Sequence, residues 1–394
     1  MKVETVVWHP RRGWSGALTA PTGRSSLGIV VADLATGDAA RALTELGEAW
    51  TPTVTIGCST AGQSVGDVRH DGSAIVAVAS FDRAELACAS VDIERVGGPR
   101  RAGRKLAEMA GHADLRALLI VADGRAADGQ TVNGTLLATG IDDVAPGLEV
   151  GGAIAGPAAA GSWVMADDGS GHVPRAGWAT AVGLVGDVEV GFGSGGGWEC
   201  FGPERLVTRS YGDVLYELDG ASALHLYREY LGPRAAGLPG TARHFPLSLR
   251  DLDGQVVVRT VVDVDEASGS LRFAGDVPQG AVAQLMCAPS ESLVHAAHLA
   301  AKQASSGAER LALAISGSGR RLSLGERIED ELDAVLTGLA PGVQLVGMQS
   351  AGELSSLGGV CELRNETVTV LTLAEGSGRA ESGRAESGRE GGAR

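Results

Sequence analysis

A recurring strand–helix–strand pattern limits what this chain can fold into more than any other feature of the sequence. Three short runs of aliphatic and β-branched residues each end in a small or polar residue, which is typical of strands covered on both faces. A helical stretch follows each run. The three runs occupy residues 27–33, 117–123 and 311–316, and the helices are expected at residues 39–50, 132–144 and 324–339.

Each helix leads through a turn into a second strand, then a glycine-rich corner, then a third strand. The second strands are predicted at residues 53–58, 148–152 and 343–348, and the third strands at residues 74–81, 179–185 and 367–373. The corners read GCSTAGQ from Gly57, GGAIAG from Gly151 and GMQSAGE from Gly347. Such spacing predicts an α/β fold of mixed sheets with helices packed on them, built from duplicated strand–helix–strand–strand units.

The two later units also share the elements that precede them. A strand at residues 85–93 leads into a helix at 98–112, and a strand at 281–287 leads into a helix at 290–305. Duplication of one module explains these matches, and chance similarity is the alternative. In the helix at 324–339, the acidic residues, Glu331 among them, are expected on the solvated face.

The regions between and after the repeats suggest where the chain divides. Residues 221–231 are expected to form an amphipathic helix, and residues 256–264 and 270–273 a hairpin. We place a domain boundary near residue 220, which gives domains at 1–220 and 221–374. Residues 375–394 repeat Gly, Arg, Ala, Glu and Ser with no larger apolar side chain, so we expect them to be disordered.

Charge and cysteine content exclude several functional classes. The chain of 394 residues has a formal net charge of −15, which disfavours nucleic acid as a partner. Its five cysteines are widely spaced and odd in number, which is typical of a reducing compartment. The start of the chain has no signal-peptide pattern, and no apolar run approaches ~18 residues. We therefore expect a cytoplasmic protein without membrane insertion.

Several motifs in a fixed order resemble the FIST family, bacterial sensory domains with an amino-terminal and a carboxy-terminal part. The family's glycine–cysteine–serine–threonine corner stands at residues 57–60, and its aspartate–glycine after a strand at 123–124. Further matches follow along the chain. They are Gly151-Gly152, Leu218-Asp219-Gly220, Gly319-Arg320, Gly352-Glu353 and Asn365-Glu366-Thr367.

The resemblance covers roughly residues 25–375 and implies FIST-like domains at 1–220 and 221–374. It implies a sensory, non-enzymatic role: binding of a small molecule, with amino acids as candidates, and no cofactor. The family is often fused to output domains, and none is recognised in this chain, so the resemblance implies signalling through a separate partner protein. Gly317 stands where the family often has cysteine, and Met348 and Ser350 replace usual aromatics, so the pocket is expected to differ in width or selectivity.

The first corner offers candidate ligand contacts. Cys58, Ser59 and Thr60 place a thiol, two hydroxyls and open backbone N–H groups at the end of a strand, where a carboxylate can bind. The alternative is a tight turn whose hydroxyls bond their own backbone. The corner recurs at Ser350, with Glu353 after it.

Charged and amide side chains near the other corners complete the predicted site. Arg320 follows a buried strand on a glycine-rich loop and suits a carboxylate, and Glu353 could receive an ammonium group. The alternative for Arg320 is a surface charge paired with Glu326, and for Glu353 a solvated turn residue. Two further candidates are Asp123 and Asn365, each of which could instead satisfy local backbone.

Other chemistry has weaker support in the sequence. His295 and His298 share a helix but lack a third metal ligand. The sequence around Ser64 fits G-x-S-x-G, yet no helix follows it, as a nucleophile elbow requires. Residues 191–196 fit G-x-G-x-x-G without a following helix, so no phosphate site is expected. A hydrolase using Cys58 or Ser64 remains the alternative function.

Overall fold

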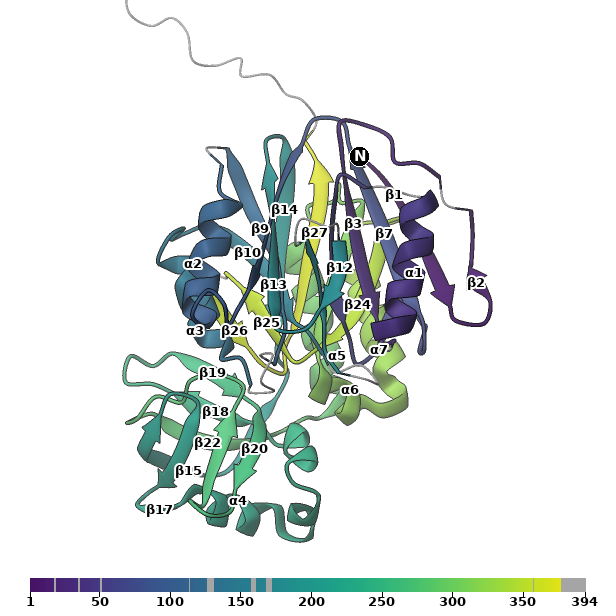
Figure 1. Ribbon diagram of the computed structural model, residues 1–394. Coiled ribbons are helices and arrows are strands. Elements are labelled where there is room, and N and C mark those ends of the chain that lie inside the picture. The colour runs from purple at the N-terminus through teal and green to yellow at the C-terminus, as the bar shows by residue number, and fades with distance from the viewer. Residues whose placement is uncertain are drawn as a thin grey trace, which may run out of the picture.

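The computed structural model describes residues 1–17, 19–34, 36–49, 52–112, 114–125, 131–156, 161–167, 172–356 and 358–376. Within these residues the α/β prediction is confirmed: several mixed sheets carry helices on their outer faces (Figure 1). No helix in this part of the chain is both long and apolar enough to cross a bilayer. The tail predicted at 375–394 lies, from residue 377 on, outside the described residues.

The body of the molecule contains three copies of one four-stranded unit. In every copy the first and second strands are parallel, the third is antiparallel to the first, and a fourth is antiparallel to the third. Listed as second, first, third and fourth strand, copy one is β4 (Val54–Ser59), β3 (Ser25–Ala32), β7 (Ala74–Phe81) and β1 (Lys2–His9). Copy two is β10 (Glu149–Ile154), β9 (Leu115–Ala122), β13 (Trp178–Val185) and β8 (Glu85–Asp92). Copy three is β24 (Gln344–Ser350), β23 (Leu311–Gly317), β27 (Val368–Glu375) and β14 (Val188–Gly195).

The helices between first and second strands complete the repeat. They are α1 (Thr36–Ala49), α3 (Gly134–Asp142), and in copy three α6 (Ser318–Leu324), η3 (Gly325–Arg327) and α7 (Ile328–Gly338). Two more helices precede first strands, α2 (Pro99–Met109) and α5 (Ser290–Ala304). The duplication predicted from sequence is therefore present, in the three copies that the sequence indicated.

A hairpin after each second strand joins the copies to one another. Each hairpin adds to the second strand of a different copy, so that copy one pairs with copy three, three with two, and two with one. The hairpins are β5 (Gln63–Val65) with β6 (Val68–Arg69), β11 (Val164–Asp167) with β12 (His172–Arg175), and β25 (Gly352–Ser355) with β26 (Glu362–Arg364). The three units cannot separate without breaking these pairings.

The main core lies where the three sheets face one another. On β3, Ile29 and Val31 point into this core, while Val30 and Ala32 pack on the opposite face with residues of α1. Equivalent strands of the other copies contribute Leu119 and Leu313 to the same cluster. Strands buried on both faces explain why the sequence shows continuous apolar runs instead of alternation.

A separate lobe is inserted between β14 and α5. It spans residues 199–287 and has its own apolar core, and Figure 1 shows it projecting from the body. Its strands are β15 (Glu199–Tyr211), β16 (Val214–Leu218), β17 (Ala221–Ser222), β18 (Leu247–Arg250), β19 (Val256–Arg259), β20 (Val261–Asp265), β21 (Ser270–Phe273) and β22 (Val282–Cys287). Its helices are α4 (Ala223–Leu231), η1 (Gly232–Gly237) and η2 (Gly240–His244). A short strand, β2 (Gly13–Trp14), completes the description of the chain.

One match between the repeats that was predicted from sequence is wrong, because one of its strands belongs to the inserted lobe. The strand predicted at 281–287 is β22, which pairs with β15 and β18 inside the lobe, so it is not the counterpart of β8. That position is taken by β14. The proposed boundary at residue 220 falls in the turn between β16 and β17 and so inside this lobe. It remains a proposal about sequence units, since sheets of the body combine strands from both sides of it.

The glycine-rich segment at residues 191–196 has a packing role. It lies in β14, against which α5 packs. A Cβ on Gly193 would lie 1.9 Å from the carbonyl oxygen of Ala300, and one on Gly191 would lie 2.0 Å from that of Ala304. Only glycine allows the helix to approach the strand this closely. The next element along the chain is strand β15 and not a helix.

Candidate functional site

The three glycine-rich corners meet at one end of the body. Ala61 donates its backbone N–H to the Gln349 carbonyl (3.1 Å), Ala351 donates to Ile154 (3.0 Å), and Gly156 donates to Ser59 (3.1 Å). These three bonds form a closed ring, in which each corner bonds the next copy. Segments almost 300 residues apart in sequence are thereby fixed against each other.

The centre of this ring is filled by protein. A Cβ on Gly156 would lie 2.6 Å from the Gln349 oxygen and 2.9 Å from the Ala61 nitrogen. Ser59 Oγ donates to the Gly156 carbonyl (2.8 Å) and accepts from the Trp163 N–H (3.0 Å). Thr60 Oγ1 lies 2.9 Å from the Gln349 carbonyl oxygen. Both hydroxyls are therefore occupied by backbone partners within and between the corners.

Cys58 lies behind the ring in an apolar setting. Its side chain is fully buried and lines an enclosed space of about 20 Å³ whose walls come from all three copies, such as Ile29, Leu119 and Leu313. Burial raises the pKa of the thiol to about 12. Neither Arg320 nor Glu353 lines this space. Asp123 nearby also disfavours the thiolate, and a buried, protonated thiol is not set up as a nucleophile.

Arg320 is a buried structural cation. Its Nε and Nη2 donate to Glu331 Oε2 at 2.9 and 2.6 Å, and both side chains are almost fully enclosed. Its Nη2 also donates to the Leu293 carbonyl (2.9 Å), and Nη1 to that of Gly196. The alternative weighed for Arg320, a surface charge paired with Glu326, is wrong, as is the expectation that Glu331 faces solvent. The pairing of Arg320 with Glu331 could not be recognised from sequence, because Glu331 stands among four exposed acidic residues of the same segment.

Glu353 and Ser350 form a buried pair near the third corner. Ser350 Oγ donates to Glu353 Oε1 (2.7 Å), and Thr367 donates its hydroxyl to Glu353 Oε2 (2.7 Å). Burial raises the pKa of Glu353 to about 8. The alternative of a solvated turn residue is wrong for Glu353. Asn365 is also buried; its Nδ2 reaches the Ala351 carbonyl at 3.5 Å, while its Oδ1 has no hydrogen-bond partner among the described residues.

Asp123 holds the turn that opens the third strand of copy two. Its carboxylate accepts the backbone N–H groups of Arg125 (3.0 Å) and Gly177 (2.7 Å) and the hydroxyl of Ser162. Asp33 has the same position in copy one and accepts from Gly72 N–H (2.8 Å). The capping role weighed for Asp123 is thus present.

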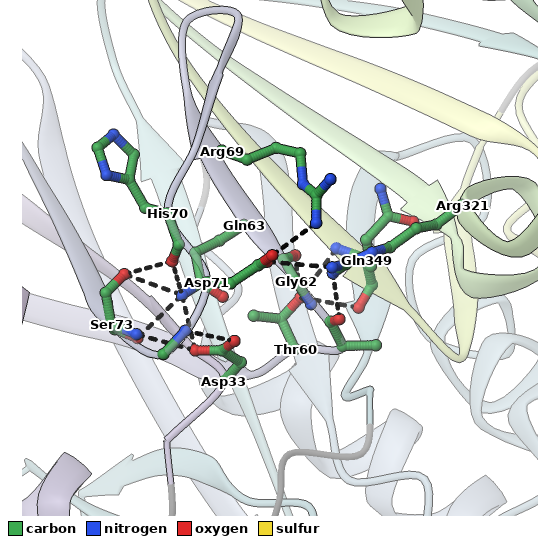
Figure 2. Close-up of polar contacts among 12 residues, drawn as sticks. Asp33, Thr60, Gly62, Gln63, Arg69, His70, Asp71, Ser73, Arg321 and Gln349 are labelled. Atoms are coloured by element: carbon green, nitrogen blue, oxygen red, sulfur yellow. Dashed lines mark hydrogen bonds and ion pairs between the residues drawn. The ribbon is translucent and has the colours of Figure 1, made fainter. Parts of the chain in front are cut away.

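Copy one continues this network to the surface (Figure 2). Gln63 Nε2 lies within hydrogen-bonding distance of Asp33 Oδ1 (2.9 Å) and the Ser73 carbonyl (2.9 Å). Beside it, Asp71 bridges Arg69 (2.5 Å) and Arg321 (3.1 Å), which tie β6 to α6. These contacts fix the hairpin of copy one on copy three.

Ser64 lies in this hairpin and not at a nucleophile elbow. It belongs to strand β5, where it pairs with Gly347 of β24. Its hydroxyl is buried and has no hydrogen-bond partner among the described residues. Strand β6 follows β5, so this serine does not lie on the strand-to-helix turn that a nucleophile elbow requires.

An open pocket lies beyond the ring, between the body and the inserted lobe. It has a volume of about 200 Å³. The body contributes residues next to the corners, and the lobe contributes η2 and β20. Its lining residues include Gly124, Ile154, Ala351, Arg243, Val261 and Leu363. None of the eight sequence-predicted residues lines it, although Asp123 and Ser350 directly precede the wall residues Gly124 and Ala351.

Arg243 is the feature of this pocket that sequence reasoning missed. It lies half-buried on η2, and its guanidinium has no hydrogen-bond or ion-pair partner within the described part of the chain. The sequence carried no signal for it, since the segment around it lacks any repeat partner. A half-buried cation lining a concave surface is suited to an anionic group.

Glu366 was missed although the sequence held a signal for it. The strand register makes Glu366 the counterpart of Gly72 and Gly177, because each lies two residues before the first paired residue of a third strand. All three have positive φ, at 58°, 67° and 75°. Aligning the third strands of the repeats would have shown a buried glutamate at a glycine position.

Metal binding has no support in the part of the chain that is described. No group of three or more His, Cys, Asp or Glu side chains there could hold an ion. His298 Nδ1 instead contacts the Ala334 carbonyl oxygen (3.1 Å).

Comparison with known families agrees with the motifs. The FIST N domain model matches residues 26–221, and the FIST C domain model matches residues 223–356. No curated protein matches the sequence. The two models together cover most of the chain and meet within the inserted lobe. The chain therefore belongs to the FIST family, whose domains are associated with sensory signal transduction.

Proposed function

We propose that this protein is a cytoplasmic sensory module that binds a small carboxylate-bearing molecule, with amino acids as the first candidates, between its body and its inserted lobe. The observation that carries the proposal is Arg243, a cation that lines the pocket and makes no side-chain hydrogen bond or ion pair with the described residues. A bound carboxylate would give this guanidinium a two-point partner, which none of the described residues supplies.

The size and lining of the pocket support a ligand of this kind. A cavity of about 150 Å³ accepts benzene, so the volume of about 200 Å³ here suits a molecule slightly larger than that. Its walls combine apolar side chains, such as Ile154, Val261 and Leu363, with polar ones, namely Arg125, Thr131, Ser162 and Arg243. Small-molecule sites commonly have this composition.

Among the residues predicted from sequence, we propose two roles. Asp123, Ser350, Glu353 and Asn365 would support the pocket from behind its wall. Cys58, Ser59, Thr60 and Arg320 would keep the corners and α6 rigid. Rigid support of this kind fixes the geometry of a site without contacting the ligand.

The chain path supports a signalling role for the pocket. The chain passes between the body and the inserted lobe at residues 196–198 and 288–289, and Gly197 has a φ of 77°. A ligand that contacts both sides would favour one arrangement of the lobe over others. A separate partner protein would then bind one arrangement of the lobe in preference to the other.

A thermal-shift panel of amino acids and simple carboxylates tests the proposal. A ligand that binds only the folded state raises the melting temperature with concentration. Arg243→Gln should abolish the shift, while Arg250→Gln, which removes an exposed arginine paired with Glu204 in the same lobe, should keep it. If no compound shifts the wild type, or if both variants respond like the wild type, the proposed pocket function is wrong.

A further inference from the structure

Two arginines line the pocket between the body and the inserted lobe, one from each side. Arg125 follows Gly124 in the body, and Arg243 lies on η2 of the lobe. No Asp or Glu is among the described residues that line this pocket. The described lining therefore carries two positive charges and no negative one, in a chain whose formal net charge is −15.

Neighbouring elements hold the backbone of both arginines in place. Arg125 donates its backbone N–H to the Asp123 carboxylate (3.0 Å) and forms an isolated β-bridge with Thr131. A Cβ on Gly319 would lie 2.5 Å from the Arg243 carbonyl oxygen, so η2 lies directly against α6 of the body. The two side chains thus begin from fixed positions on opposite walls, as recognition of a ligand of defined length requires.

The carboxylate of Asp123 does not take the place of a ligand in the pocket. It accepts the backbone N–H groups of Arg125 and Gly177 (2.7 Å) and the hydroxyl of Ser162, and Asp123 itself does not line the pocket. Arg125 also makes a contact within the protein. A guanidinium has several N–H donors in a planar fork, so a contact of this kind leaves donors for a ligand.

We propose that the ligand of this pocket is a short aliphatic dicarboxylate, with one carboxylate bound by Arg243 and the other by Arg125. The inference rests on the proposed function of the pocket and names the class of ligand. Pairs of arginine and carboxylate are frequently bidentate, so each end of the ligand would be held in a fixed orientation. The apolar side chains of Ile154, Val261 and Leu363 suit the methylene groups between the two ends.

The same lining gives no counterpart to the ammonium group of an amino acid. A charged group that leaves water needs a partner of opposite charge or several hydrogen bonds in return. None of the described lining residues offers a carboxylate. Among amino acids, aspartate and glutamate should therefore bind more tightly than asparagine and glutamine, and succinate should bind at least as tightly as aspartate.

A second carboxylate also makes the ligand a better signal. A ligand with both ends bound joins Arg125 of the body to Arg243 of the lobe, whereas a ligand with one carboxylate pairs with a single arginine. Only the ligand that contacts both sides gains affinity from one particular arrangement of the lobe. A ligand shifts a conformational equilibrium by no more than this difference in affinity.

Calorimetric titration of the full chain with succinate and with its monoamide, succinamate, tests the inference, because the two compounds have nearly the same shape. The wild type should bind succinate roughly tenfold more tightly or better, the usual effect of one hydrogen-bonded charge. Arg125→Gln should make the two affinities about equal, and Arg243→Gln should remove binding of both. Arg116→Gln is the control: this exposed arginine of β9 hydrogen-bonds the Gly186 carbonyl (3.2 Å), and its loss should keep the preference.

The outcomes separate this inference from the proposed function. Equal affinities for the two compounds in the wild type, or a preference that survives in Arg125→Gln, would overturn the dicarboxylate inference and leave the pocket function standing. If none of the carboxylates binds, the proposed function is wrong as well. Inorganic phosphate and methyl phosphate complete the panel, because they carry their charge on one group; tighter binding of either than of succinate would overturn the assignment to a dicarboxylate.

Discussion

Replacing Arg320 with methionine separates a structural from a ligand-binding role for this residue. The change removes three kinds of contact: the pair with Glu331, at 2.6 and 2.9 Å, and the bonds to the Leu293 and Gly196 carbonyls. Removing one partner of a buried ion pair costs about 3–5 kcal/mol, because the other charge stays buried. The stranded carbonyls add to this cost, so we expect a loss of about 4 kcal/mol or more in the free energy of unfolding.

Urea denaturation followed by circular dichroism measures this loss, and a second variant gives its cause. Arg320→Met with Glu331→Leu removes both charges and should recover much of the stability, since apolar pairs often replace buried ion pairs without loss. Arg327→Met is the control, because that arginine pairs with Glu291 and Asp330 at the exposed surface and should matter little. A loss below about 1 kcal/mol for Arg320→Met, or a double variant no more stable than the single one, would refute the reasoning.

Three further predictions test other parts of the account. Gly156→Val should prevent folding or lower the free energy of unfolding by several kcal/mol (~3 or more), because its Cβ would lie 2.6 Å from the Gln349 oxygen. Gly37→Ala in α1, which has open space around it, should slightly stabilise the protein, and thermal melts compare the two variants. Glu353 has a folded pKa of about 8 against an ordinary 4.5, so stability should fall as pH rises between these values, and denaturation at several pH values should show a flatter profile in Glu353→Gln. Iodoacetamide at pH 8 should label the exposed Cys200 and spare Cys58 until the protein is unfolded, as peptide mass spectrometry would show.

Repetition made most of the body predictable from sequence. The strands were recognisable because residues such as Ile29, Leu119 and Leu313 lie in continuous apolar runs, which burial on both faces requires. The glycine-rich corners were recognisable because backbone approaches backbone there. What the repeat did not reveal was the cyclic exchange of hairpins, since short strands such as β5 and β25 carry no signal for their partner.

The candidate site was less predictable for a physical reason. Sequence reasoning places polar residues at strand ends, but it does not say which of them are used up by neighbouring backbone. Ser59 and Thr60 hydrogen-bond to backbone of the corners, and Arg320 pairs with Glu331. Their polar groups are therefore already occupied by partners within the body. Arg243 escaped notice because only the docking of the lobe brings it to the pocket.

Hydrogen–deuterium exchange with the amino acid that gives the largest thermal shift tests the central claim most directly, because it reports where that ligand acts. We predict protection on both sides of the pocket, at residues 239–243 and 261–262 of the lobe and at residues 154–155 of the body. Arg243→Gln should remove this protection. Protection confined to residues 57–62 and 347–350, with exchange in the lobe unchanged, would contradict the account. It would indicate that the ligand binds at the glycine-rich corners instead.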